Sequence, residues 1–370
     1  MNFCKLIGSR LPAGFTLGLA VVLGIFGCNA FSERNGGYRG PGQIQSWPTP
    51  SWSEAFVYKS AHYTVRTNTS PDTANHIGRF MEKALSGYRS VVGDPVESLP
   101  RFFINVFASC EEYEKVVRHL GMPPGITTGL YSPVPPGAIY LSYAKCLKDP
   151  PAVTLLHEGL HQFLHKTASF RVPEEALNTL PPEKHVLMSV PLWLSEGLAD
   201  YMEGSVMSED RINIGSINRP RLVYLQKLIR SGKCPPLAEV LSRRYGEPFL
   251  AGDYAVAWGI VYTLRHAPRA NVQAERRKQL ESYISACRQA FYKNPDAEFA
   301  RDFLRNGKPL EDFNHQWAAY IARNSLKAFE QIIVSQGSTL DAWEQDWRAR
   351  ILSLDSNDPF GGLPHTSIAG

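Results

Sequence analysis

Apolar residues recur at helical spacing along much of the chain. After Asp149-Pro150-Pro151, which has the form of a helix N-cap followed by first-turn prolines, they are Leu155, Leu156, Leu160, Phe163 and Leu164. The segment Asp72–Val92 has the same periodicity, and Ser70-Pro71 precedes it as a start signal. Tyr254–Leu264 is almost continuously apolar. We therefore expect helices at these places.

Shorter stretches have the pattern of strands. His62–Thr67 alternates and is β-rich, and Phe102–Phe107 is rich in aromatic and β-branched residues. Gly129–Ser132 and Ala138–Tyr143 flank a proline-rich turn. Past Tyr201 the pattern is mostly helical. The sequence therefore predicts an α+β fold, with a small mixed sheet and helices, followed by a mostly helical C-terminal region.

A weak internal repeat lies near the C-terminus. Leu310–Ile321 echoes Leu340–Ile351, and each copy carries aromatic residues four apart. This spacing is typical of core packing on one helix face, and two copies are too few for a solenoid. We expect the tail after Leu354 to be loose.

The first 28 residues have the form of a bacterial export signal. Lys5 and Arg10 give a basic start, and Leu11–Gly27 is uncharged and mostly apolar. A small residue before Cys28 resembles a lipobox, which would make Cys28 the lipidated first residue of a mature envelope protein anchored to a membrane. An ordinary signal peptide cut elsewhere, or an uncleaved anchor, is the alternative.

Composition indicates a globular protein. The 370 residues are 44% hydrophobic and 20% charged. The formal net charge is +4, and it falls to about +2 without Lys5 and Arg10. No basic stripe is interleaved with aromatic residues, so nucleic acid is not an expected partner. The sequence leaves the oligomeric state open.

Beyond the leader, the cysteines are even in number: Cys110, Cys146, Cys234 and Cys287. In an oxidising compartment they can form up to two disulfides, whose pairing the sequence does not decide. Buried free thiols are the alternative.

The first chemical motif is His157-Glu158-Gly159-Leu160-His161 on the predicted buried helix. Residues four apart share a helix face, so His157 and His161 can offer two imidazole nitrogens to one metal ion. Glu158, beside the first of them, can act as general base.

The second motif is Trp193–Tyr201, in which Glu196 opens another helical pattern. Glu196 would be the third ligand and would leave the fourth position of a tetrahedral zinc site to water. Asp200 lies one turn later, where its carboxylate could accept the free ring N–H of a ligand histidine.

A structural interpretation of both motifs stays open. In it, two unrelated amphipathic helices carry histidines and glutamates that are solvated or satisfied in a core. His165 continues the series one turn beyond His161, but helical drift carries it off the metal face. We interpret it mainly as a polar residue near the helix end.

Together the two motifs resemble the gluzincins, the thermolysin-like clan of zinc peptidases. Within that clan the chain is similar to a bacterial family of predicted peptidases of unknown function, and the resemblance covers roughly His62 to His266. It implies that one Zn²⁺ is bound by His157, His161 and Glu196. It also implies Glu158 as base and Asp200 as the partner of a ligand histidine.

The resemblance has further implications. The gap before Glu196 is longer than in the best-known gluzincins, so Lys166–Val190 is expected to be a surface loop near the cleft. An oxyanion donor is needed downstream of Glu196. Tyr254 is favoured and His266 is the alternative, although Tyr254 could simply be a core residue.

The expected activity is peptide-bond hydrolysis in the cell envelope, with a peptide or protein substrate. An endopeptidase is favoured because Gly129-Leu130-Tyr131 stands where an aminopeptidase would carry amine-binding carboxylates. Gly129–Ser132 would border the cleft and pair with substrate backbone. The alternative is a non-catalytic envelope lipoprotein that uses the zinc fold and the helical C-terminus as a binding scaffold.

These expectations divide the chain into six parts. They are a lipoprotein-type signal peptide (1–27), a flexible tether (28–51), an α/β subdomain with cleft-edge strands (52–150), a zinc-binding helical subdomain (151–270), a helical C-terminal region (271–355) and a loose tail (356–370).

Overall fold

The computed structural model describes most of the chain from residue 52 to residue 361. The described residues are 52, 55–95, 98–119, 127–133, 137–143, 151–167, 169–171, 186–188, 190–208, 212–245, 247–292, 321, 324–334 and 338–361. The predicted signal peptide, Cys28, the tether and most of the first repeat copy lie outside them.

The main sheet has five strands and mixed pairing. Its strands are β1 (Phe56–Lys59), β2 (Tyr63–Thr67), β3 (Phe102–Phe107), β4 (Gly129–Ser132) and β5 (Ala138–Ser142). The spatial order is β1-β2-β3-β5-β4, with β2, β3 and β5 parallel and the two outer strands antiparallel to their neighbours. The predictions for the last four of these strands are confirmed, whereas β1 was not predicted. β4 is left at one edge of the sheet.

Helices make up most of the remainder. They are α2 (Pro71–Val92), α3 (Cys110–His119), α4 (Pro151–Thr167), α6 (Leu192–Glu203), α7 (Arg219–Arg230), α8 (Leu237–Leu241), α9 (Ala251–Arg265), α10 (Ala270–Tyr292), a short π-helix (Glu330–Val334) and α13 (Leu340–Ser353). A mixed α/β fold with a small mixed sheet is thus confirmed.

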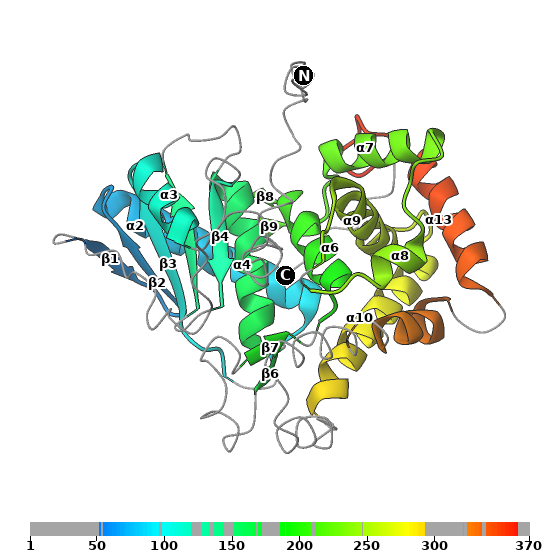
Figure 1. Ribbon diagram of the computed structural model, residues 1–370, viewed down its shortest axis with the longest axis horizontal. Coiled ribbons are helices and arrows are strands. Elements are labelled where there is room, and N and C mark those ends of the chain that lie inside the picture. Colours follow the sequence, from blue (N-terminus) through cyan, green and yellow to red (C-terminus); the bar gives the residue numbers. More distant parts are fainter. Residues whose placement is uncertain are drawn as a thin grey trace, which may run out of the picture.

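Helices α4 and α6 lie between the sheet and the C-terminal helices (Figure 1). α4 contacts β4 and β5 on one side and α6 on the other, and α6 packs in turn on α9. A single core cluster includes Val65 on β2, Leu160 on α4, Trp258 on α9 and Trp347 on α13. The two motif helices are therefore held at the centre of the molecule.

Local sequence explains where these helices begin. Ser70 caps α2 by accepting a hydrogen bond from the Thr73 backbone N–H, and Pro71 follows it. Pro191 is the N-cap of α6, so this helix begins one turn before Glu196, which was expected to open it. Every α6 residue from Leu192 to Met202 is buried, as expected of a helix with protein on all sides.

Two expectations about irregular segments are wrong in part. Residues 166–190 are not only a loop, because α4 continues to Thr167 and β6 (Ser169–Arg171) pairs with β7 (Val186–Met188). The start of the tail is not loose. The Pro359 carbonyl accepts the Ile217 backbone N–H at 2.7 Å, and the Phe360 carbonyl accepts the Tyr262 hydroxyl at 3.0 Å. A second small hairpin, β8 (Val206–Met207) with β9 (Ile212–Asn213), was not predicted.

The cysteines divide between the two expected states. Cys110 is disulfide-bonded, and its partner lies outside the described residues. Cys234 and Cys287 are buried free thiols. Trp347 in the second repeat copy is buried, as the aromatic spacing predicted. Among the described residues, no helix is both long and apolar enough to cross a membrane.

Close packing of α6 on α9 depends on Gly197. A Cβ atom at this position would lie 2.6 Å from the Ala257 carbonyl oxygen, which belongs to the backbone of α9. The helices would have to move apart to accept it. Glycine at this place in the second motif therefore has a packing role as well as being part of the pattern.

Gly197→Ala is expected to lower the free energy of unfolding by about 1–3 kcal/mol, because overpacking outweighs the helix propensity that alanine gains. Thermal unfolding would measure this. Gly252→Ala is the control, since its Cβ would meet side chains alone and no backbone: the Pro235 ring at 3.2 Å and the end of Leu228 at 3.6 Å. Equal melting temperatures for Gly197→Ala and wild type would contradict the prediction.

Candidate metal centre

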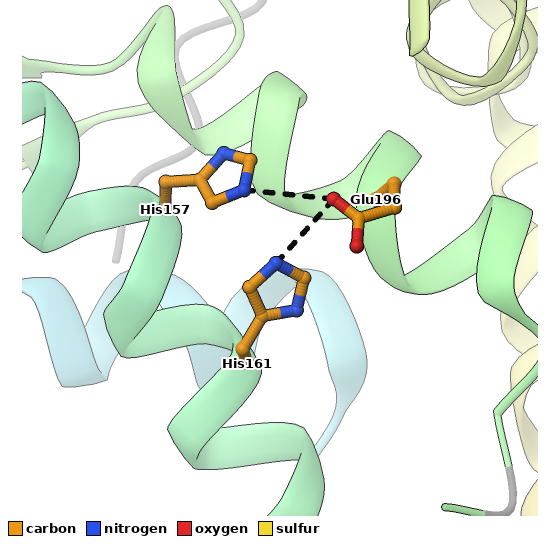
Figure 2. Close-up of side chains that lie close together, drawn as sticks. All are labelled: His157, His161 and Glu196. Carbon is orange, nitrogen blue, oxygen red and sulfur yellow. Dashed lines mark ion pairs between the residues drawn. The ribbon is translucent and has the colours of Figure 1, made fainter. Parts of the chain in front are cut away.

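Two histidines of α4 and one glutamate of α6 converge on one point (Figure 2). The Glu196 Oε2 atom lies 3.6 Å from His157 Nε2 and 3.5 Å from His161 Nε2. The three ligand atoms all lie within 4.8 Å of one another. The four-residue spacing on α4 and the crossing of α6 thus bring together the set expected from the sequence.

These side chains are buried and their facing atoms lack hydrogen-bond partners. His157 and Glu196 are 0% exposed, and His161 is 1% exposed. Within the described chain, neither Nε2 atom nor either Glu196 oxygen has a hydrogen-bond partner. Buried polar atoms without partners are costly and rare. A cation bound among them would satisfy these atoms, so the residues fit a metal ion.

The charge state of Glu196 suits this role. Burial by itself would raise the pKa of Glu196, but the His161 and His157 imidazoles outweigh burial and bring the pKa to about 2. The carboxylate is therefore ionised at neutral pH and available as a ligand.

Glu158 is held beside the cluster by the edge strand. Its Oε2 atom accepts the backbone N–H of Tyr131 on β4 at 2.8 Å. Burial raises the pKa of Glu158, while the charges of His157 and His161 and the Tyr131 N–H oppose the rise. A buried carboxylate with a raised pKa and one fixed oxygen is suited to taking up a proton.

The outer nitrogen of His161 contacts Ser195, which the sequence argument missed. Nδ1 of His161 lies 2.9 Å from the Ser195 hydroxyl oxygen. This contact fixes the ring and leaves Nε2 facing Glu196. The only signal in the sequence was the position of Ser195, directly before Glu196.

The outer nitrogen of His157 corrects the expectation for Asp200. Nδ1 of His157 lies 2.8 Å from Glu203 Oε1, but 3.6 Å from Asp200 Oδ1, which is too long for a hydrogen bond. Asn218 donates to the other Glu203 oxygen at 2.8 Å. Glu203, seven residues after Glu196 on the same helix face, therefore orients His157.

Asp200 pairs with Arg221 instead. Arg221 Nη2 donates a hydrogen bond to Asp200 Oδ1 at 3.1 Å, and Arg221 Nε lies 2.7 Å from Asp200 Oδ2, so the ion pair meets both carboxylate oxygens. Burial raises the pKa of Asp200, and the Arg221 guanidinium opposes the rise. His157, Asp200 and Glu203 form a second group with metal-ligand spacing. Arg221 already supplies the positive charge beside this second group.

The two candidate oxyanion donors lie in different surroundings. Tyr254 is fully buried on α9, and its hydroxyl has no hydrogen-bond partner among the described residues. Burial and the nearby Glu196 and Asp200 carboxylates raise the pKa of Tyr254, and the guanidinium carbon of Arg221, the partner of Asp200, lies 5.1 Å from the centre of its ring. His266 instead contacts the Tyr201 hydroxyl at 2.9 Å and stacks on the Tyr262 ring.

His165 is not part of the cluster. Its Nδ1 atom lies 2.7 Å from the Tyr131 hydroxyl oxygen, and the side chain is buried in the last turn of α4, near the helix end as expected.

Comparisons with known proteins give no independent identification. No protein-family model matches this chain. No curated protein matches it either.

Replacing each carboxylate by its amide would separate the two roles. Glu203→Gln is expected to lower metal affinity about 10- to 100-fold, because it removes the acceptor that orients His157. Asp200→Asn should change metal affinity by less than about threefold. It should lower the free energy of unfolding by about 3–5 kcal/mol, because Arg221 is left buried without its partner.

Metal affinities would be measured by chelator competition, and stabilities would be measured by thermal unfolding. A larger loss of metal affinity in Asp200→Asn than in Glu203→Gln would indicate that Asp200, and not Glu203, orients His157. Glu111→Gln, the same change at an exposed carboxylate of α3, serves as the control.

Proposed function

We propose that this protein is a zinc-dependent peptide-bond hydrolase of the bacterial cell envelope. The observation that carries the proposal is the buried set of two imidazole Nε2 atoms and the Glu196 carboxylate, all without hydrogen-bond partners in the described chain, beside the buried Glu158. Two imidazoles and one carboxylate are a ligand set of catalytic zinc sites. The resemblance to gluzincins supports the same assignment.

His157, His161 and Glu196 would hold the ion. Zinc held there would supply a Lewis acid for the scissile carbonyl and the attacking water. Glu158 would take the proton from that water and return it to the leaving amine. Its Oε2 atom is held by the Tyr131 N–H, so Oε1 is the oxygen left to exchange the proton. Tyr254 would donate a hydrogen bond from its hydroxyl to the oxyanion.

The position of β4 supports a peptide substrate. β4 is an edge strand of the sheet, and the same strand contacts Glu158 through Tyr131. An extended peptide added along this edge would lie beside the proposed general base. We place the protein in the envelope because of the leader and Cys28, and propose that it acts there as an endopeptidase.

One observation favours the second candidate, a non-catalytic scaffold. The ligands and Glu158 are all at most 1% exposed, which is also how a structural metal site is built. A structural site has no need of a general base, however, and the buried Glu158 next to His157 supports the hydrolase.

Glu158→Gln is expected to keep about one zinc per chain and to lose cleavage of a mixed peptide library by at least about 100-fold, because it removes the general base. His161→Ala should lose both zinc and cleavage. His76→Ala, at an exposed histidine of α2, is the matched control and should keep both. Zinc content and cleavage would be measured on the same preparations.

Absence of zinc from the wild-type protein would refute the site assignment. A zinc-loaded wild type that cleaves nothing would support the scaffold instead.

Tyr254→Phe is expected to keep zinc and to lower kcat about 100- to 1,000-fold, as for other single oxyanion donors. The substitution also removes a buried hydroxyl that has no partner in the described residues, so the melting temperature should not fall. His266→Gln is the comparison. Equal losses of kcat in the two variants would argue against Tyr254 as the donor.

A further inference from the structure

Arg221 contacts both Asp200 and Tyr254. Its guanidinium meets both carboxylate oxygens of Asp200 on α6. The same guanidinium carbon lies 5.1 Å from the centre of the Tyr254 ring on α9. The arginine side chain is 11% exposed, and Asp200 is 0% exposed. A buried guanidinium that contacts both a carboxylate and an aromatic ring has little freedom to move.

The Tyr254 ring needs such a support. Its hydroxyl has no hydrogen-bond partner in the described chain, so no polar contact there fixes the ring. Phe249 meets the ring edge to face, with centroids 4.7 Å apart, and Arg221 packs against it as a cation–π contact. The position of the hydroxyl therefore depends on where Arg221 is held.

Asp200 and the start of α7 determine that position. Asn218 caps α7 by accepting the Arg221 backbone N–H, and its amide donates to Glu203 and to the Asp200 carbonyl on α6. The first turn of α7 is thus attached to the last two turns of α6. Asp200 then fixes the far end of the arginine side chain.

We propose that Arg221 is a positioning residue that places the Tyr254 hydroxyl at the metal centre, with Asp200 as its anchor. The inference rests on the proposed function. It assigns Asp200 to the support of the proposed oxyanion donor, Tyr254, rather than to the orientation of His157. This role requires both a planar guanidinium against the Tyr254 ring and an ion pair with Asp200. A lysine would supply the positive charge, but not a planar group that can meet both carboxylate oxygens.

Arg221→Lys is the main test because it keeps the positive charge beside Asp200. We expect kcat to fall about 10-fold, as loss of a desolvated cation–π contact implies, with KM and zinc affinity changed less than about twofold. Asp200→Asn should lower kcat in the same way. In the Tyr254→Phe background, Arg221→Lys should have no further effect on kcat, because the hydroxyl that it positions is absent.

Arg221→Met could fail to fold because it leaves Asp200 unpaired, so it is paired with Asp200→Asn in a double variant. Arg219→Met, at an exposed position two residues earlier on α7, is the control. A merely structural arginine would give parallel losses of melting temperature, zinc affinity and kcat, with additive effects of Arg221→Lys and Tyr254→Phe. That result would overturn the proposal, as would wild-type kcat in Arg221→Lys.

Binding of a substrate mimic would test the positioning role of Arg221 independently of peptide cleavage. A peptide phosphonate carries a tetrahedral anionic centre, and its dissociation constant can be measured without turnover. If zinc-loaded wild type binds it but cleaves no peptide, the hydrolase proposal fails. Arg221→Lys and Tyr254→Phe should then weaken phosphonate binding non-additively if the positioning role is correct. Unchanged binding in Arg221→Lys, or no binding by wild type, would overturn the positioning role.

Discussion

Burial of negative charge between two helices is the constraint on which this structure depends. Glu158 lies on α4 next to His157, and Glu196, Asp200 and Glu203 lie on α6, which packs on α4. All four are buried or nearly so. Ionised carboxylates removed from water are strongly destabilising unless each is compensated. Each has a different partner here: a backbone N–H of the edge strand, a pair of imidazoles, a guanidinium, and an imidazole with a side-chain amide.

Compensation of this kind links parts of the chain that are far apart in sequence. The sheet contributes through β4, and the start of α7 contributes Asn218, its N-cap, and Arg221. Because each partner satisfies a charge that would otherwise be unpaired, the mixed sheet and α7 are both attached to the same pair of helices. Tyr254 on α9 joins them through its ring contact with Arg221. The imidazole nitrogens and the Glu196 oxygens at the centre of this network are what a bound cation would complete.

Adjacent residues of α6 face different neighbours. Glu196 faces the α4 histidines, whereas Gly197 allows the α9 backbone to approach closely. The close approach fixes the spacing between α6, which carries Glu196, and α9, which carries Tyr254. Packing and the candidate metal site are therefore linked in this segment, because the glycine that sets the helix spacing is adjacent to one of the candidate ligands.

The sequence by itself determined the local features. Helical periodicity placed His157 and His161 on one face, and patterning located the strands β2 to β5 and the helices α2, α4, α6 and α9, because both depend on residues close together in the chain. Only the tertiary structure decided which α6 carboxylate reaches His157. Asp200 and Glu203 share a helix face, and the choice depends on how α4 crosses α6. It also decided the roles of Asn218 and Arg221, since their partners lie on a neighbouring helix that periodicity cannot place.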